Sequence, residues 1–320
     1  MAQQRYEHLI KLLSSGKFTR EEAIGGQVTF TTVPGVGEQT FWLNGRENME
    51  GMELSFTWAT HNDFGLWHGG RAIHAHPYPE VHFYVGLDTA NINYLGAEVE
   101  VCLGEEMETY ILTEPAVVVI PAGMPHGPMT TKRIYSPRGF GFYSAALSPY
   151  FKTEWLEAPE KAAAGNKYAG LVKPLKEFIV TQRKKPVKPA AAETPMKLGP
   201  GNADHLAWLF GEDLEGLDIN LDWGFFSSPG LWHRGVGAHV HTADEVLVFA
   251  GTDPARMNYL GAGIEIDLGK EHERYFIDKT SVVVLPAGTP HGPIVTHWVD
   301  RPFAFFSINR AAKPDMTFID

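Results

Sequence analysis

Two sets of residues in this 320-residue chain have the types and spacing of metal ligands. Each set has the pattern His-x-His-x-x-x-Glu, followed further along the chain by Pro-x-Gly-x-x-His. Three imidazoles and one carboxylate offer nitrogen and oxygen donors that suit Mn, Fe, Ni, Zn or Cu better than Ca or Mg. The patterns therefore predict two transition-metal sites. The ligands of the first site are His74, His76, Glu80 and His126, and those of the second are His239, His241, Glu245 and His291.

The spacing between the two sets indicates an internal duplication. From His74 to His239 is 165 positions, and from His126 to His291 is the same number, so no insertion separates the copies over this region. Neighbouring residues repeat at the same spacing, because the segment NYLGA at 93–97 returns at 258–262. A duplicated domain is the simplest explanation of self-similarity at a fixed period.

The elements that must position these ligands are short β-strands. From about residue 41 to residue 150, runs rich in Val, Ile, Phe and Tyr alternate with Gly, Pro and Asn, which favours an antiparallel barrel or sandwich. In a strand, side chains two positions apart share a face, so His74 and His76 point to the same side, and Glu80 reaches that side from the start of the next strand. The turn at 121–125 then brings His126 from a distant segment.

Both halves resemble the cupin superfamily, whose two motifs are His-x-His-x(3,4)-Glu and Pro-x-Gly-x-x-His on a small β-barrel. The resemblance covers about residues 60–150 and 225–312. It implies an all-β chain of two tandem cupin domains, which are double-stranded β-helix or jelly-roll barrels, with short helical N-terminal and linker segments. It also implies that all eight residues named above are metal ligands. One divalent transition metal per domain is expected, with Mn or Fe favoured and Zn, Ni or Cu as alternatives.

The expected domains are an N-terminal helix and strand extension at 1–40, a first cupin at 41–160, a linker at 161–197 and a second cupin at 198–320. The linker holds nine Lys or Arg against two Glu and is broken by prolines, and we interpret its basic run as solvated rather than as a nucleic-acid patch. The extension has no counterpart in the second copy, so we expect it to pack across the domain junction or at a subunit interface. Its apolar residues follow helical spacing and are Tyr6, Leu9, Ile10, Leu12 and Leu13.

Composition excludes several classes of partner. The formal charge of −11 repels the phosphates of nucleic acids and anionic lipids. No apolar run approaches the ~20 residues that a membrane span requires. The single cysteine, Cys102, excludes an intrachain disulfide, and its place in an alternating strand pattern indicates a structural role. We therefore expect a cytoplasmic protein with a small-molecule substrate and no nucleic-acid or membrane partner, and the family resemblance adds a homodimer.

Two residues of the first copy are candidate catalytic groups because they follow Glu80 on its strand. His82 and Tyr84 should share the face of the carboxylate, whereas the second copy has Leu247 and Phe249 at these positions. Either residue could donate a proton or orient a substrate. A merely structural hydrogen bond is an equally good reading of Tyr84.

A third candidate is Arg71, three residues before His74. Its placement is similar to that of the substrate-binding arginine of oxalate decarboxylases, and a guanidinium beside a metal can clamp an anionic substrate with paired hydrogen bonds. Alternatively, Arg71 faces solvent at the start of a strand. Thr130 and Lys132 stand where the second copy has Val295 and His297, which also predicts a more polar first cavity.

The dipeptides 67–68 and 232–233, Trp-His in both copies, precede the ligand strands. Because both copies keep them, a shared architectural role, such as closing the mouth of the barrel, is a better interpretation than substrate chemistry.

Cupins include decarboxylases, dioxygenases, isomerases, lyases and binding proteins, so the fold alone does not define a reaction. The working hypothesis is a metal-dependent bicupin enzyme of the dioxygenase or decarboxylase type. It would act on a small oxygen-rich substrate, namely a carboxylate, an enol or a hydroxy-ketone, at the first metal. Two alternatives stand beside it: a redox-neutral isomerase, lyase or hydrolase that uses the metal, and a non-catalytic bicupin that binds a small ligand.

Overall fold

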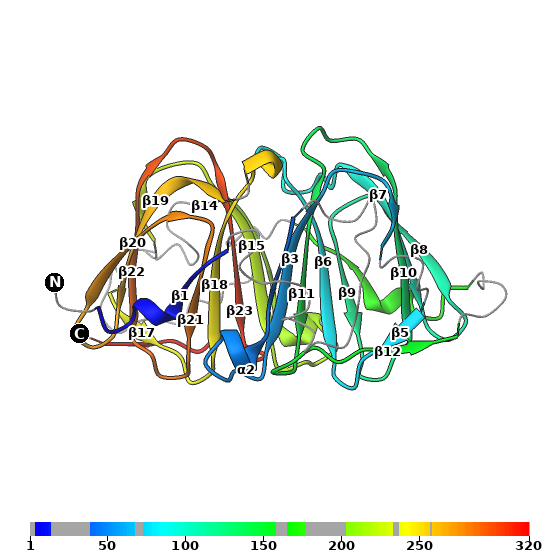
Figure 1. Cartoon of the computed structure of the whole chain (residues 1–320), viewed down its shortest axis with the longest axis horizontal. Coiled ribbons are helices and arrows are strands. Elements are labelled where there is room, and N and C mark those ends of the chain that lie inside the picture. The colour runs from blue at the N-terminus through cyan, green and yellow to red at the C-terminus, as the bar shows by residue number, and fades with distance from the viewer. Residues whose placement is uncertain are drawn as a thin grey trace. The chain divides into compact units, whose positions relative to one another are not determined.

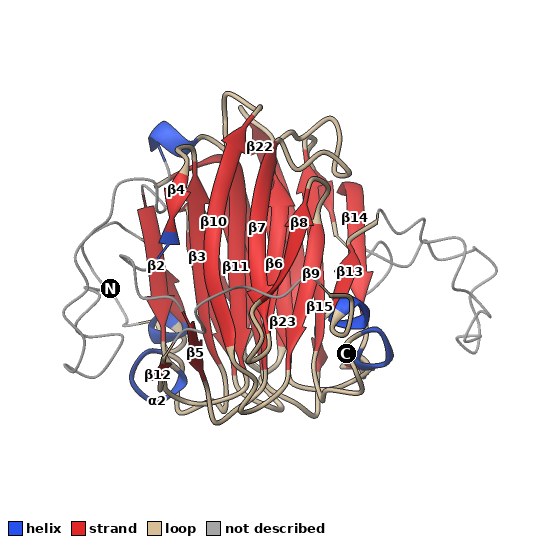
Figure 2. Cartoon of the chain, turned by 90° about the vertical axis from the view of Figure 1, so that its right-hand side faces the viewer, coloured by secondary structure: helices blue, strands red, loops and turns tan. Residues whose placement is uncertain are grey.

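The computed structural model describes residues 4–13, 39–67, 73–157, 165–176, 203–232, 237–256 and 258–319. Strands make up most of this part of the chain, as Figure 2 shows in red, and its helices are short. The all-β prediction is therefore confirmed. None of the described helices is both long enough and apolar enough to cross a bilayer. Most of the predicted linker and most of the extension at 1–40 lie outside the described residues.

The chain divides into two compact units. The N-terminal unit comprises Ser14–Lys176 and Asp253–Ala255. The C-terminal unit comprises Met1–Leu13, Glu177–Thr252 and Arg256–Asp320. Within the described residues, hydrogen bonds link the strands of each unit into two open six-stranded sheets rather than one closed barrel.

In the N-terminal unit, one sheet has the strand order β13-β9-β6-β11-β3-β2. The other has the order β12-β5-β10-β7-β8, with β4 also paired to β10, and all of these pairings are antiparallel. The elements of this unit are β2 (Gln39–Leu43), α2 (Gly45–Asn48), β3 (Ser55–His61), β4 (Gly65–Leu66), β5 (Ile73–Ala75), β6 (Glu80–Gly86), β7 (Ala97–Leu103), β8 (Glu108–Leu112), β9 (Ala116–Ile120), β10 (His126–Ile134), β11 (Phe140–Ala146), β12 (Glu154–Leu156), η3 (Ala169–Leu171) and β13 (Val172–Pro174).

The C-terminal unit repeats this arrangement. One sheet has the order β1-β21-β18-β23-β15-β14, and the other has the order β20-β19-β22-β17-β24, with β16 paired to β22. The elements of this unit are η1 (Glu7–Leu9), β1 (Ile10–Leu12), β14 (Ala203–Leu209), η4 (Gly211–Asp213), β15 (Asn220–Phe226), β16 (Gly230–Leu231), β17 (His239–Val240), β18 (Glu245–Gly251), β19 (Tyr259–Leu268), β20 (Glu273–Lys279), β21 (Ser281–Leu285), β22 (His291–Val299), β23 (Phe303–Asn309) and β24 (Thr317–Phe318). The short helix η5 (Pro254–Arg256) has residues in both units.

A buried tryptophan anchors the core of each unit at the same place. The indole of Trp67 stacks on His61, with ring centroids 4.1 Å apart, and its Nε1 donates a hydrogen bond of 2.9 Å to Thr131 Oγ1. The indole of Trp232 stacks on Phe226 at 4.1 Å and donates to the Oγ1 atom of its own partner, Thr296, at 2.8 Å. These repeated contacts agree with the architectural role predicted for both tryptophans. The two histidines that follow them lie outside the described residues.

A short arm precedes each copy of the duplicated domain, and the two arms have the same structure. In each arm a turn of 3-10 helix leads into a three-residue strand, η1 into β1 and η3 into β13. Strand β1 pairs with β21 of the C-terminal unit, where Figure 1 draws it in dark blue, and β13 pairs with β9 of the N-terminal unit. Two expectations for the extension were therefore wrong: residues 10–12 form a strand, and the arm has a counterpart at 165–176.

The hydrogen bonds of the two arms correspond one to one. Tyr6 N donates to Tyr275 Oη at 2.8 Å, and Tyr6 Oη donates to Glu271 Oε2 at 2.8 Å. In the other arm, Tyr168 N donates to Tyr110 Oη at 2.9 Å, and Tyr168 Oη donates to a carboxylate oxygen of Glu106, also at 2.9 Å. Each tyrosine ring lies over a glycine of positive φ, where an added Cβ would collide with the ring; these glycines are Gly269 and Gly104. Each arm is thus an integral part of the sheet on which it packs.

Candidate metal centres

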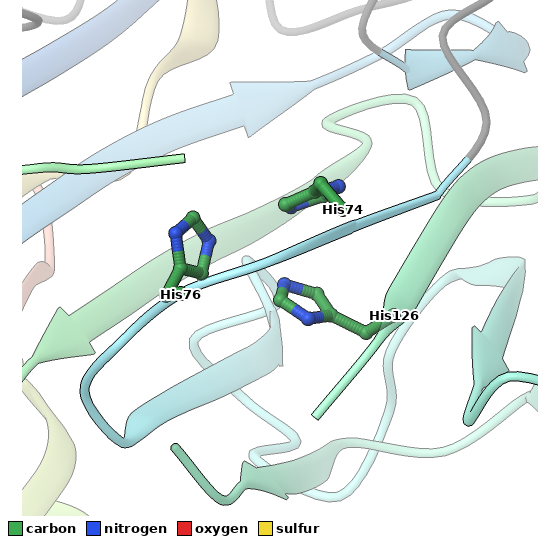
Figure 3. A group of neighbouring side chains, drawn as sticks. All are labelled: His74, His76 and His126. Carbon is green, nitrogen blue, oxygen red and sulfur yellow. The ribbon is translucent and has the colours of Figure 1, made fainter. Parts of the chain in front are cut away.

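The first ligand set converges as the spacing predicts. His74 lies in β5 and pairs across the sheet with His126, the first residue of β10, while His76 follows β5 directly. The ring centroid of His126 lies 4.1 Å from that of His74 and 5.1 Å from that of His76. Candidate ligand nitrogens of the three residues lie within 4.8 Å of one another. Figure 3 shows the three rings side by side, and all three side chains are buried.

Glu80 opens β6 and completes this set. Its Oε2 atom lies 3.4 Å from His76 Nε2 and 3.2 Å from His82 Nε2. Glu80, His82 and His126 also have candidate ligand atoms within 4.8 Å of one another. His82 therefore lies within the candidate metal centre, in contact with the Glu80 carboxylate. This agrees with the prediction that residues two positions apart on β6 share a face.

The backbone sets the orientation of two of these imidazoles. His76 Nδ1 lies 2.7 Å from the carbonyl oxygen of Lys152, and His126 Nδ1 lies 3.0 Å from that of Met124. An Nδ1 atom that faces a carbonyl oxygen must carry the proton, which leaves the Nε2 lone pair of each ring for a ligand. The Nε2 atom of His126 is buried and has no hydrogen-bond partner among the described residues. A buried acceptor in this state fits a metal ion, which would occupy its lone pair.

Electrostatics within the first set keep the ligands in metal-binding protonation states. Burial raises the pKa of the Glu80 carboxyl, but the charge and hydrogen bond of His82, with His76 and His126 close by, outweigh burial and lower that pKa below its usual range. Burial and the charges of His76 and His82 lower the pKa of His126 to about 3. The carboxylate is therefore ionised and His126 is neutral at neutral pH, as metal binding requires.

The second set has the same geometry. The ring centroids of His239 and His241 lie 4.2 Å and 5.2 Å from that of His291. Glu245 Oε2 lies 3.3 Å from His241 Nε2 and 3.2 Å from His291 Nε2. The Nδ1 atoms again contact backbone carbonyl oxygens: His241 Nδ1 contacts the oxygen of Asp315, and His291 Nδ1 contacts that of Thr289. Burial raises the pKa of Glu245, but the contacts with these two histidines lower it below its usual range.

Of the two predicted catalytic residues that the structure describes, His82 and Tyr84, it is His82 that touches the ligand set. Its Nδ1 atom is buried and has no hydrogen-bond partner among the described residues. Tyr84 lies deeper, in the core cluster, where its hydroxyl donates to Met129 Sδ at 3.1 Å and burial raises its pKa well above the usual value. That contact fits the structural reading of Tyr84. Arg71 lies outside the described residues.

The expectation that Thr130 and Lys132 line the first cavity was wrong for Lys132, whose side chain is 43% exposed and forms an ion pair with Glu100 at 3.3 Å. Buried positions on β10 fall instead at Met129 and Thr131. The pairing of β10 with β7 shifts register between His126 and Met129, and such a bulge reverses the alternation of side chains beyond the ligand. Counting by twos from His126 therefore assigns the wrong face.

The interior of the C-terminal unit holds polar residues that the sequence analysis missed. Asp222 on β15, together with Ser307 and Asn309 on β23, is less than a tenth exposed. Ser307 donates to Asp222 through its backbone nitrogen at 2.6 Å and through its hydroxyl at 2.9 Å. The available signal was the pair of polar residues Asn220 and Asp222, which alternate at the start of a strand that continues with Trp223 and Phe225. The second interior is thus polar as well: Asp222 and Ser307 stand where the first unit has Thr57 and Ser144, and Asn309 stands where the first unit has Ala146.

The structure resembles solved oxalate decarboxylases of Bacillus subtilis. The enzyme at pH 4.6 aligns with a TM-score of 0.53 and 14% identity over 88% of this chain and 74% of that chain. A structure concerned with the substrate binding mode and reaction specificity of oxalate decarboxylase aligns at 0.52 and 13%, and one concerned with the Mn(II) centres of the Bacillus subtilis enzyme at 0.52 and 14%, each over 88% of this chain and 75% of that chain. No protein-family model matches the sequence. No curated protein matches it either. At this identity the likeness concerns the fold, and it confirms the bicupin architecture.

Proposed function

We propose that the protein is a metal-dependent bicupin enzyme that acts on a small oxygen-rich substrate at the His74, His76, Glu80 and His126 centre. The observation that carries this proposal is the convergence of four buried ligands in each unit, to which the N-terminal unit adds His82 against Glu80. The resident ion would be Mn or Fe, and the relatives of similar fold include an enzyme described with Mn(II) centres. The substrate class is a carboxylate, an enol or a hydroxy-ketone.

His82 is the group that moves a proton in this proposal. Its Nε2 atom is 3.2 Å from the Glu80 carboxylate, while its buried Nδ1 atom makes no hydrogen bond within the described part of the chain. A histidine held at one nitrogen and available at the other can take a proton from a bound substrate or return it. A bound divalent ion supplies Lewis-acid chemistry at the substrate oxygens. In this proposal Arg71 binds the anionic end of the substrate.

The test compares two matched variants, Glu80→Ala and Glu245→Ala, with turnover and metal content per chain measured on the same samples. We expect Glu80→Ala to abolish turnover, whereas Glu245→Ala lowers metal content and the stability of the C-terminal unit and affects turnover less. His82→Leu, which installs the residue of the second copy, should lower kcat by about 10²–10⁴-fold with both ions retained. Equal losses of turnover in the two Glu variants, with both folded, would contradict the assignment of catalysis to the N-terminal unit.

Two experiments separate this proposal from its alternatives: turnover without O2, and substitution of a metal ligand. Turnover of the same substrate panel without O2 distinguishes dioxygenase chemistry, which stops, from redox-neutral isomerase, lyase or hydrolase chemistry, which requires no external oxidant and continues. A non-catalytic ligand-binding bicupin would be favoured if His76→Ala kept full ligand binding and normal metal content. The convergence of His76 with the other ligands argues against that outcome.

A further inference from the structure

Asn309 is a buried side chain whose hydrogen bonds are not made within the described protein. It lies at the end of β23, is 1% exposed, and neither its amide oxygen nor its amide nitrogen has a partner among the described residues. Burying an amide without hydrogen bonds is unfavourable, so such groups are rare and point to something that binds them. The question is what Asn309 faces.

The pairing of β18 with β23 places Asn309 directly opposite Glu245. Residues directly opposite in an antiparallel pair share a face, with Cβ atoms about 4.5–5.5 Å apart. The side chain of Asn309 is therefore on the same face of the sheet as the carboxylate that contacts His241 and His291. In the N-terminal unit the residue opposite Glu80 is Ala146, which offers only a methyl group.

A second polar group lies one cross-strand step away. The next inward pair is Leu247 opposite Ser307. Ser307 donates two hydrogen bonds to the carboxyl group of Asp222. Burial raises the pKa of Asp222 to about 7, against the hydrogen bonds of Ser307 that lower it, so this group is partly protonated near neutral pH. The corresponding residue of the first copy is Thr57. The two centres thus share their ligands and differ in the polar groups that surround them.

We propose that the C-terminal unit binds a small α-hydroxy acid at its metal centre, with the amide of Asn309 holding the ligand. The amide nitrogen donates to a carboxylate oxygen, and the amide oxygen accepts from the hydroxyl on the adjacent carbon. A plain carboxylate satisfies only the donor, so the hydroxyl gives the site its specificity. This inference rests on metal binding by the second ligand set as proposed above, and it is independent of turnover at the first.

Calorimetric titration of the metal-loaded full-length protein with glycolate, and with acetate as the analogue that lacks the hydroxyl, tests the proposal. We expect glycolate to bind at least about ten-fold more tightly than acetate, and Asn309→Leu to lose that preference while acetate binding changes little. Without ligand, Asn309→Leu should melt at a higher temperature, because the unsatisfied amide is gone.

Asn220 provides a matched control, since it is a buried asparagine directly opposite Asn309 in the sheet. Its amide is already used, with Nδ2 donating to the oxygen of Ala311 at 2.8 Å and Oδ1 accepting from Trp208 Nε1 at 3.2 Å. Asn220→Ala should therefore lower the melting temperature and leave glycolate affinity unchanged. The two asparagines are expected to respond in opposite directions.

The proposal would be overturned if Asn309→Leu kept two ions per chain and bound glycolate with unchanged affinity. If this variant also melted at a lower temperature than the wild-type protein, the amide of Asn309 would have a structural role. If elemental analysis shows that Asn309→Leu loses the second ion, Asn309→Ala is titrated instead and the same outcomes decide. A wild-type protein that takes up no ion at His239, His241 and His291 contradicts the metal proposal, whereas one with both ions that does not prefer glycolate contradicts this inference alone.

Discussion

Asp222 is a buried carboxyl group on a central strand, and its titration should be visible in the stability of the protein. Burial raises its pKa to about 7 in the folded chain, while an unfolded aspartate has a pKa of about 3.9. The folded state therefore holds the proton more tightly, and the stabilisation that this provides is complete below about pH 3.9 and is lost as pH rises to about 7. The sign is opposite to that of an ion-paired carboxylate.

Asp222→Asn should remove this pH dependence. The amide can still accept from the backbone nitrogen of Ser307, and it can donate to the serine hydroxyl in place of accepting from it. Relative to the variant, the wild-type protein should lose up to about 4 kcal/mol of unfolding free energy between about pH 4 and pH 7. Denaturant unfolding across that range measures the difference.

The exposed aspartate Asp63 provides a control substitution, Asp63→Asn, which is measured over the same pH range. Parallel profiles for wild-type protein and Asp222→Asn would mean that the pKa of this carboxyl group is the same in the folded and unfolded chain, and the interpretation of Asp222 as a partly protonated group would be wrong.

At this scale the sequence predicted the ligands better than their surroundings. The convergence of the eight candidate ligands could be predicted because a repeated motif spacing is independent of local geometry. The surroundings were inferred by counting alternate residues from a ligand, which works on β6, where His82 and Tyr84 do face inward, and fails on β10, where a bulge intervenes. Nothing in a single sequence marks the bulge, and Asn309 could be recognised only from its pairing with Glu245.

At the scale of elements, the arms show why a short apolar run does not define its own structure. The apolar residues of the first arm fit a helical period, yet the run is too short for periodicity to separate a helix from a strand. What determines its structure is pairing with β21, whose edge accepts the arm as an additional strand. The counterpart was hidden because Tyr6 and Tyr168 are 162 positions apart, three fewer than the 165 of the ligand motifs.

The two tyrosines of the arms give a matched pair of variants. Tyr6→Ala should destabilise the C-terminal unit by about 2 kcal/mol, through lost ring packing over Gly269 and the lost bond to Glu271, and Tyr168→Ala should do the same to the N-terminal unit. Hydrogen exchange measured by mass spectrometry locates the effect. Faster exchange is expected in β20 and β21 for the first variant and in β8 and β9 for the second.

Each variant is the control for the other, because the two substitutions are chemically identical. If Tyr6→Ala accelerated exchange in β8 and β9, the arm would belong to the unit that follows it in the chain, and the pairing of β1 with β21 would be wrong.

At the scale of the whole molecule, the two units share a duplicated fold and differ in the side chains of their interiors. The ligand sets, the tryptophan anchors and the arms are repeated. Two inward positions differ: His82 of the first unit corresponds to Leu247 of the second, and Ala146 corresponds to Asn309. The duplication and the all-β class could be predicted from the sequence because both depend on spacing and composition over long stretches. The divergence of the interiors depends on single inward residues, and these are visible only when strands are paired.

Metal removal tests the plan as a whole, because both units should be stabilised by an ion that binds the folded state alone. Such an ion contributes about 2.7 kcal/mol when its free concentration is about 100-fold above its dissociation constant. Chelation should lower the melting temperature of the wild-type protein and accelerate exchange around β5 and β10 and around β17 and β22 alike. In His74→Ala, which removes a ligand of the first set only, chelation should affect β17 and β22 alone, and in His239→Ala it should affect β5 and β10 alone. A protein that binds no ion in wild-type form, and whose melting temperature ignores the chelator, would show that these eight buried side chains are satisfied by one another, and the assignment of both centres would fail.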